Sequence, residues 1–204
     1  MKNIFMMAVL AAAVAFTSCS KPEKTIENLK TAATGEANAS AKYAAFSAQA
    51  AKDSLPKIAA MFAATSAAEA IHSANHIAEL SKLGVTFTPT VDAVECDSTL
   101  ANLYTAKNGE EYEFSTMYPD FIEVAKTEKA NGALQVFDWA MKAEVKHAEF
   151  YIAAIQSLEA GTKEDALPAE WLVCPKCGDT FIAGTEGAAC ELCATTAEKF
   201  NKFQ

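Results

Sequence analysis

The sequence predicts an all-α four-helix bundle followed by a small metal-binding ribbon, and three observations lead to this fold class. Residues 25–158 are rich in Ala, Glu, Lys and Leu, and apolar residues recur there at steps of three and four, as in helices. Each of four helical stretches carries Glu among these apolar positions. Near the C-terminal end, segment 174–193 holds two C-x-x-C pairs, a spacing typical of metal ligands.

Size and composition limit the classes of protein that fit. The 204 residues are 51% hydrophobic and 21% charged, which allows a buried core in one or two domains and excludes disorder for most of the chain. All 17 basic residues are Lys, and 26 Asp and Glu bring the net charge to −9. Because no basic stripe or Lys-rich run is present, we do not expect nucleic acid as a partner.

Residues 1–18 predict a secretory signal. Lys2 precedes an apolar run over 4–16, which is shorter than the roughly 20 residues that a membrane-spanning helix needs. Cys19, followed by polar residues 20–24, resembles the processing site of a bacterial lipoprotein and would become the lipidated mature N-terminus. The alternative is a plain signal cut near Ser18. We therefore expect an exported protein of the cell envelope, held to a membrane by a lipid anchor only.

Four helices are expected in the bundle, residues 24–160. The first covers roughly 24–52, and the second opens with Pro56 in its first turn and stops at Gly84. Residues 85–97 break the helical periodicity and predict a long crossover. The third helix covers roughly 98–129 and the fourth roughly 131–160. Two helix pairs joined by one long crossover are the ferritin-like way of building a four-helix bundle.

The apolar stripe of every expected helix contains a carboxylate. A buried unpaired carboxylate is costly, so four helices that each place one in the core need a shared cation. The pattern also repeats, because the step from Glu36 to Glu69 is only one position shorter than the step from Glu110 to Glu144. This repeat suggests a duplicated helix pair.

Two of the carboxylates belong to E-x-x-H motifs. Residues three apart on a helix lie about 60° apart around its axis, so the Glu and the His can share one ion. With one Glu from each remaining helix, two such motifs supply the ferritin-like di-iron carboxylate arrangement, which suits redox chemistry with peroxide or dioxygen. The six expected ligands are Glu36, Glu69, His72, Glu110, Glu144 and His147.

His76 lies one turn beyond His72 and has no counterpart in the repeat, where Tyr151 takes the corresponding place. We expect it to support a ligand or to pack in the core rather than to bind metal.

One segment identifies a family. Residues 109–121, GEEYEFSTMYPDF, together with Glu36 and the two E-x-x-H motifs, closely resemble the rubrerythrin family. The resemblance covers about residues 24–204. It implies a seventh ligand, Glu113, which would exchange with His72 as one iron moves on changing redox state. It also implies that Tyr43 and Tyr118 lie near the site, where they hydrogen-bond ligands, donate protons or only pack.

The tail predicts a tetrahedral thiolate site, with 12 residues between its two C-x-x-C pairs. Spacing alone does not separate zinc from iron, so a zinc ribbon is the alternative. Residues 170–204 resemble the rubredoxin-like domain of rubrerythrins, which implies iron, and 161–169 is the expected linker. A ribbon this short depends on its metal for stability. Cys96 stands apart, without predicted chemistry. The four expected ligands are Cys174, Cys177, Cys190 and Cys193.

The resemblance implies an oxidative-stress peroxidase in which hydrogen peroxide, two electrons and two protons give two waters at the di-iron site. The Fe(Cys)₄ centre would return the electrons, between the subunits of a head-to-tail homodimer. The alternative is a ferritin-like protein that oxidises and stores iron, and the four tail cysteines argue against it because storage needs no re-reduction. A third possibility is a protein with purely structural metals. The sequence does not identify the electron donor.

Overall fold

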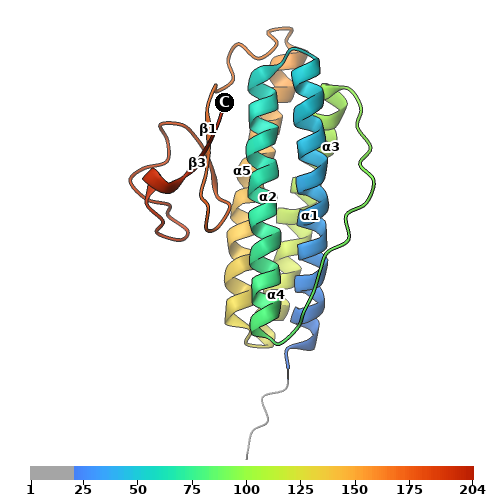
Figure 1. The fold of residues 1–204 in the computed structure, drawn as a ribbon, viewed down its shortest axis with the longest axis vertical. Coiled ribbons are helices and arrows are strands. Elements are labelled where there is room, and N and C mark those ends of the chain that lie inside the picture. Colours follow the sequence, from blue (N-terminus) through green and yellow to red (C-terminus); the bar gives the residue numbers. More distant parts are fainter. Residues whose placement is uncertain (1–20) are drawn as a thin grey trace, which may run out of the picture.

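The computed structural model describes residues 21–204, in which long helices pack side by side and a small sheet lies against one flank (Figure 1). Helix α1 spans Glu23–Lys52 and α2 spans Pro56–Lys82, close to the expected bounds. Pro56 opens α2 at a position where a missing N–H costs no helical hydrogen bond. The predicted signal segment and Cys19 lie outside the described residues.

The crossover connects the two helix pairs. Residues 83–98 contain no helix or strand and run past α1 to the start of α3, Thr99–Tyr112 (Figure 1). At its end the hydroxyl of Thr99 donates a hydrogen bond of 2.6 Å to Asp53 in the turn between α1 and α2. The predicted long connection is confirmed.

The third helical rod runs without a break from Thr99 to Thr127, close to the expected 98–129, but it is not regular α-helix throughout. A π-helical turn, η1 at Glu113–Met117, separates α3 from α4, which spans Tyr118–Thr127. A π turn accommodates one extra residue. This extra residue explains why the repeat spacing between motif carboxylates is one position longer in the second half of the bundle than in the first.

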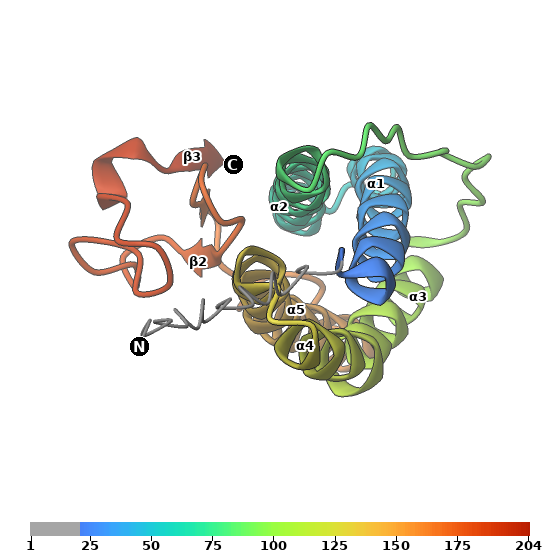
Figure 2. The same ribbon diagram turned by 90° about the horizontal axis from the view of Figure 1, so that it is seen from below.

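Helix α5, Asn131–Glu159, completes the bundle, which Figure 2 shows along its axis. The apolar core forms two layers, one around Phe46 and Phe62 and the other around Leu29 and Phe137. On α1, α2 and α5 the motif carboxylates fall between the residues of these two layers. None of the helices within residues 21–204 has the length and apolar character to cross a membrane.

The segment expected as a linker, 161–169, is bound to the bundle. Glu164 accepts hydrogen bonds from the backbone N–H groups of Lys57, at 2.9 Å, and Ile58, at 3.0 Å. These groups belong to the first turn of α2, where a carboxylate is favourable and Leu55 offers no side-chain cap. Leu167 is buried in the same core layer as Phe62. The chain that leaves α5 is therefore held against the start of α2.

The C-terminal ribbon is a three-stranded antiparallel sheet with strand order β2-β1-β3. Strand β1 spans Trp171–Val173, β2 spans Thr180–Ile182, and β3 spans Asn201–Phe203 after the 3₁₀ turn η2, Ala197–Lys199. The ribbon packs against α2 and α5, outside the bundle (Figure 2). The fold class predicted from the sequence is confirmed.

Candidate metal centres

The six residues expected as di-iron ligands converge in the middle of the bundle, and all are buried. They form two groups of four, and within each group one ligand atom from every residue lies within 4.8 Å of the others. Glu69 and Glu144 belong to both groups, so they can bridge two ions. The first group adds Glu36 and His72, and the second adds Glu110 and His147.

The bridging role follows from how the two imidazoles face the shared carboxylates. His72 Nδ1 lies 2.8 Å from one oxygen of Glu69 and 3.1 Å from one oxygen of Glu144. His147 Nδ1 lies 3.0 Å and 2.8 Å from the other oxygen of each. Each bridging carboxylate therefore presents one oxygen to each half of the site, and Nδ1 is the nitrogen that each histidine offers.

The charges of the site call for cations. Burial, reinforced by neighbouring carboxylates, raises the pKa of Glu36 and of Glu110 well above the ordinary range. Although burial alone would lower it, the pKa of His147 is raised to about 9 because Glu69 and Glu144 face the ring. Burial and mutual repulsion thus disfavour the charged form of these carboxylates, and metal ions bound among them would offset the repulsion and favour that form.

Two buried oxygens of this site face neither a hydrogen-bond donor nor a ring nitrogen among residues 21–204. They are Glu36 Oε2 and Glu110 Oε2. Buried acceptors without partners are rare in folded proteins. The unpartnered atoms belong to the residues that form the two groups, so the residues present fit a pair of iron ions.

Two tyrosines bind the carboxylates that are not shared. The Tyr43 hydroxyl donates to Glu110 Oε1 at 2.7 Å, and the Tyr118 hydroxyl donates to Glu36 Oε1. The pairing is crossed, since Tyr43 lies on α1 with Glu36. Tyr118 follows Glu110 at a step one position longer than the step from Glu36 to Tyr43, and the π turn absorbs the difference. Each carboxylate keeps its Oε2 without a donor among the described residues.

Glu113 lies beside the two groups but belongs to neither. It opens the π turn and is half-buried, and its Oε1 would lie 4.0 Å from a Cβ placed on Gly35, next to Glu36. Burial and the charges of Glu144 and Glu69 raise its pKa. The role of Glu113 as a seventh ligand therefore stays a prediction.

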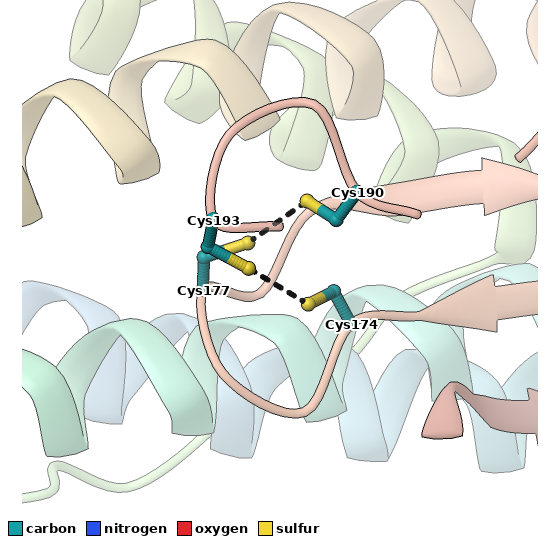
Figure 3. A group of neighbouring side chains, drawn as sticks. All are labelled: Cys174, Cys177, Cys190 and Cys193. Atoms are coloured by element: carbon teal, nitrogen blue, oxygen red, sulfur yellow. Dashed lines mark hydrogen bonds between the residues drawn. The ribbon is translucent and has the colours of Figure 1, made fainter. Parts of the chain in front are cut away.

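The second centre is the cluster of the four tail cysteines, whose sulfurs point toward one another (Figure 3). The sulfurs of Cys174 and Cys193 lie 3.4 Å apart, and those of Cys177 and Cys190 lie 3.5 Å apart. A hydrogen bond from Cys177 lowers the pKa of Cys174 to about 4, whereas burial raises that of Cys190 to about 11. A bound cation would favour the thiolate form of all four.

The ribbon touches the di-iron site directly, a contact that the sequence did not predict. Thr180 Oγ1 lies 2.9 Å from His147 Nε2 and donates its own hydrogen to the carbonyl of Gly178. Hence His147 Nε2 carries the proton and Nδ1 is left to bind metal. A Cβ on Gly178 would lie 2.3 Å from His72 Nε2, so only glycine allows this approach.

Further hydrogen bonds hold the ribbon in this place. Asn75 on α2 donates to the carbonyl of Lys176 at 2.9 Å, and Trp139 on α5 donates to the carbonyl of Leu192 at 3.2 Å. Lys146 on α5 forms an ion pair with Asp179, which is buried. Cysteine spacing gives no indication of these partners. The Gly after the first C-x-x-C pair was the available signal, because it permits a close backbone approach.

Comparison with known sequences finds one matching family model and several similar relatives. The family model described as Rubrerythrin matches residues 27–155. Nigerythrin of Nitratidesulfovibrio vulgaris is 37% identical over 180 residues, which cover 88% of this chain and 86% of nigerythrin. Rubrerythrin of Porphyromonas gingivalis is 29% identical over 174 residues, covering 85% and 87% of the two chains.

Solved structures with a similar fold include members of the same group of proteins. Nigerythrin in its fully reduced, all-ferrous state superposes with a TM-score of 0.78 at 33% identity, covering 99% of this chain and 100% of that one. An open-pore ferritin from Archaeoglobus fulgidus has a TM-score of 0.60 at 18% identity over 71% of this chain and 90% of its own, which shows a shared fold alone.

Proposed function

Because the chain belongs to the rubrerythrin family, a family of di-iron proteins of oxidative-stress defence, we propose that it reduces hydrogen peroxide to water and is re-reduced through its Fe(Cys)₄ centre. The overall reaction is hydrogen peroxide plus two electrons and two protons giving two waters. One observation supports this proposal most strongly, namely the contact between the ribbon and both metal-facing histidines. A storage protein would need no such connection.

The residues of the site take distinct roles in this proposal. When bound, the iron pair supplies a place for peroxide and the two electrons. Glu69 and Glu144 hold the two halves together, and the hydroxyls of Tyr43 and Tyr118 each donate a hydrogen bond to one of the two remaining carboxylates. The apolar layers on either side exclude water. Glu113 lies close enough to join the ligands as the redox state changes, in exchange with His72, as the family resemblance implies.

Electrons would enter through the ribbon. Gly178 directly follows Cys177, and its backbone abuts the His72 ring, so one peptide bond and one nonbonded contact lead from a thiolate ligand to the di-iron site. The contact lies within one chain in this structure, and a head-to-tail homodimer could form it between two chains. Transfer between the subunits of a homodimer stays our prediction.

Mixed oligomers test that route. One chain carries Cys177→Ser and keeps its bundle, and the other carries Glu144→Ala and keeps its ribbon. Turnover by the mixture, when neither parent variant turns over, would support transfer between chains. An inactive mixture that has formed heterodimers would instead assign the transfer to a single chain.

The peroxidase itself is tested by Cys177→Ser in isolation. The variant should lose the visible absorption of the tail iron and keep two irons in the bundle, which shares no ligand with the tail. After chemical reduction it should consume about one peroxide per di-iron site, whereas steady turnover with a donor to the ribbon should collapse. Cys96→Ser is the control, because this exposed thiol lies outside the cluster. Unimpaired steady turnover with a metal-free tail would refute the proposal, and many irons per chain would favour storage.

The location of the protein is a separate proposal. The apolar run before Cys19 supports export and a lipid anchor at the cell envelope. Fractionation after labelling with radioactive fatty acid should recover labelled protein in the membrane fraction. Unlabelled protein in the cytosol with Met1 intact would contradict export.

A further inference from the structure

We propose that His76 is a positioning residue that directs the hydroxyl hydrogen of Tyr118 toward Glu36, to which Tyr118 donates a hydrogen bond, and thereby makes the two halves of the di-iron site unequal. Its kinetic consequence rests on the proposed peroxidase function, but its structural consequence does not. His76 belongs to neither metal group and has no part in the electron route.

The position of His76 is tightly defined. It is completely buried on α2, one turn beyond His72, and its Nε2 lies 3.1 Å from the Tyr118 hydroxyl. Its ring packs against Phe137, with 5.4 Å between the ring centroids. Tyr118 in turn donates to Glu36, so the three side chains form a continuous hydrogen-bond chain that ends at a metal-binding carboxylate.

The direction of this chain follows from counting hydrogens. A phenol has one hydrogen, and Tyr118 gives it to Glu36 Oε1, so the phenol oxygen must accept from His76 Nε2–H. Burial lowers the pKa of His76 to about 3, so the ring is neutral and Nδ1 carries no hydrogen. This agrees with Nδ1 having no hydrogen-bond partner among residues 21–204, where a buried N–H would be left orphaned.

The opposite tautomer would reverse the chain. With the hydrogen on Nδ1, His76 Nε2 would become an acceptor and the Tyr118 hydroxyl would turn toward it. Glu36 Oε1 would then face a phenol lone pair in a buried site, which is unfavourable. The tautomer of His76 therefore determines whether Glu36 Oε1 accepts a hydrogen bond from Tyr118, and hence which oxygen of Glu36 is left to bind metal.

The other half of the site lacks such a residue. Tyr43 donates to Glu110, but the repeat places Tyr151 where His76 would be, and the Tyr151 hydroxyl donates to Thr65 at 2.7 Å. Among residues 21–204 no side chain donates a hydrogen bond to the Tyr43 oxygen, so no second residue orients the Tyr43 hydroxyl as His76 orients that of Tyr118. The repeated halves of the bundle therefore hold their unshared carboxylates differently.

The first test reads the tautomer without any turnover. In protein loaded with Zn²⁺ in place of iron, nitrogen NMR should show His76 protonated at Nε2 and unprotonated at Nδ1. The His76 signals are assigned by their loss in His76→Leu. A hydrogen on Nδ1 would overturn the proposal. If His76→Leu does not fold, His76→Gln serves for assignment, and the wild-type tautomer still decides.

The second test compares the two irons. In the oxidised holoprotein, His76→Leu should shift the Mössbauer doublet of one iron and leave the other in place, and His76→Gln, which restores an N–H donor, should move it back. Tyr151→Phe, at the matching position of α5, is the control and should shift neither doublet. Unchanged doublets in His76→Leu at full iron occupancy would contradict the proposal.

The third test connects His76 to catalysis. Loss of one hydrogen bond predicts that kcat for peroxide falls about fivefold in His76→Leu with little change in KM. The same substitution in a Tyr118→Phe background should have no further effect, and additive effects would overturn the proposal. If the wild-type protein itself shows no peroxide turnover, the peroxidase function fails, whereas the tautomer and the iron doublets still decide the role of His76.

Discussion

Replacing Thr180 by Val removes the link between the ribbon and the metal-facing His147. Thr180 is completely buried, and its Oγ1 is the acceptor for His147 Nε2–H at 2.9 Å. Valine has nearly the same shape, so the main change is the lost acceptor. A buried N–H left without a partner costs about 1–3 kcal/mol. Removal of such a hydrogen-bond partner from a metal-binding histidine typically weakens metal affinity by about 10- to 100-fold.

The expected result is therefore that Thr180→Val binds one of its two bundle ions about 10- to 100-fold more weakly. Anaerobic titration with ferrous iron against a competing chelator measures this affinity for each ion. The variant should also transfer electrons from the ribbon to the bundle more slowly, because the same bond holds the two parts together. The visible absorption of the tail iron should be unchanged, since Thr180 is not a thiolate ligand.

Two variants serve as controls. Thr180→Ser keeps the hydroxyl and should stay close to the wild-type affinity. Thr185→Val makes the same substitution on an exposed loop, where the hydroxyl donates to the carbonyl of Ile182 in the ribbon. If Thr180→Val binds both ions within twofold of the wild type, the contact does not orient His147.

Three other perturbations test separate parts of the account. Glu113→Ala should keep both irons and the fold, because six ligands remain, but should slow peroxide turnover; wild-type turnover at full iron occupancy would contradict the role of Glu113. Gly178→Ala should displace the ribbon, because the added Cβ would lie 2.3 Å from His72 Nε2 and the φ of residue 178 is +81°. Steady turnover should therefore fall, whereas a single turnover by the reduced bundle should persist. Unchanged steady turnover would contradict the contact between the ribbon and the bundle. In metal-stripped protein, the pKa of His147 is raised from 6.5 to about 9 in the folded state, so between these pH values the folded state binds more protons than the unfolded state. The free energy of unfolding should therefore fall as the pH rises from 6.5 to about 9. A free energy that instead rises over this pH range, measured by chemical denaturation, would contradict the prediction.

The convergence of the candidate ligands could be predicted from the sequence because helical spacing fixes the direction of each side chain. Two E-x-x-H motifs at the same phase as core residues can only point inward, and the structure brings Glu69, His72, Glu144 and His147 together as expected. Glu36 and Glu110 followed from the apolar stripes of the other two helices. Local periodicity was sufficient for all six residues.

The π turn and the crossed tyrosine bonds were not predicted. Apolar periodicity does not specify whether a backbone N–H bonds four or five residues back, so the third rod was expected to be regular. The signal was the unequal spacing of the motif carboxylates in the two halves of the repeat. The partner of Tyr43 depends on which helix faces α1, which no pattern within a single helix contains.

The docking of the ribbon also lay beyond the sequence. Cysteine spacing predicts the thiolate cluster but not which side of the ribbon meets the bundle. The contacts of Thr180, Gly178 and Asn75 join segments about 30 to 100 residues apart, and these depend on the tertiary path of the chain. Similarly, Glu164 stood in an apparently plain linker, yet it caps the start of α2.

The central claim is that electrons pass from the tail iron to the bundle irons after these have reacted with peroxide. Rapid mixing of fully reduced protein with one hydrogen peroxide per chain, followed by visible absorption and freeze-quench Mössbauer spectroscopy, tests it most directly. We predict that the bundle irons are oxidised first, and that the tail iron is then oxidised as a bundle iron regains an electron. A tail iron that stays ferrous while the bundle irons remain oxidised would contradict the account.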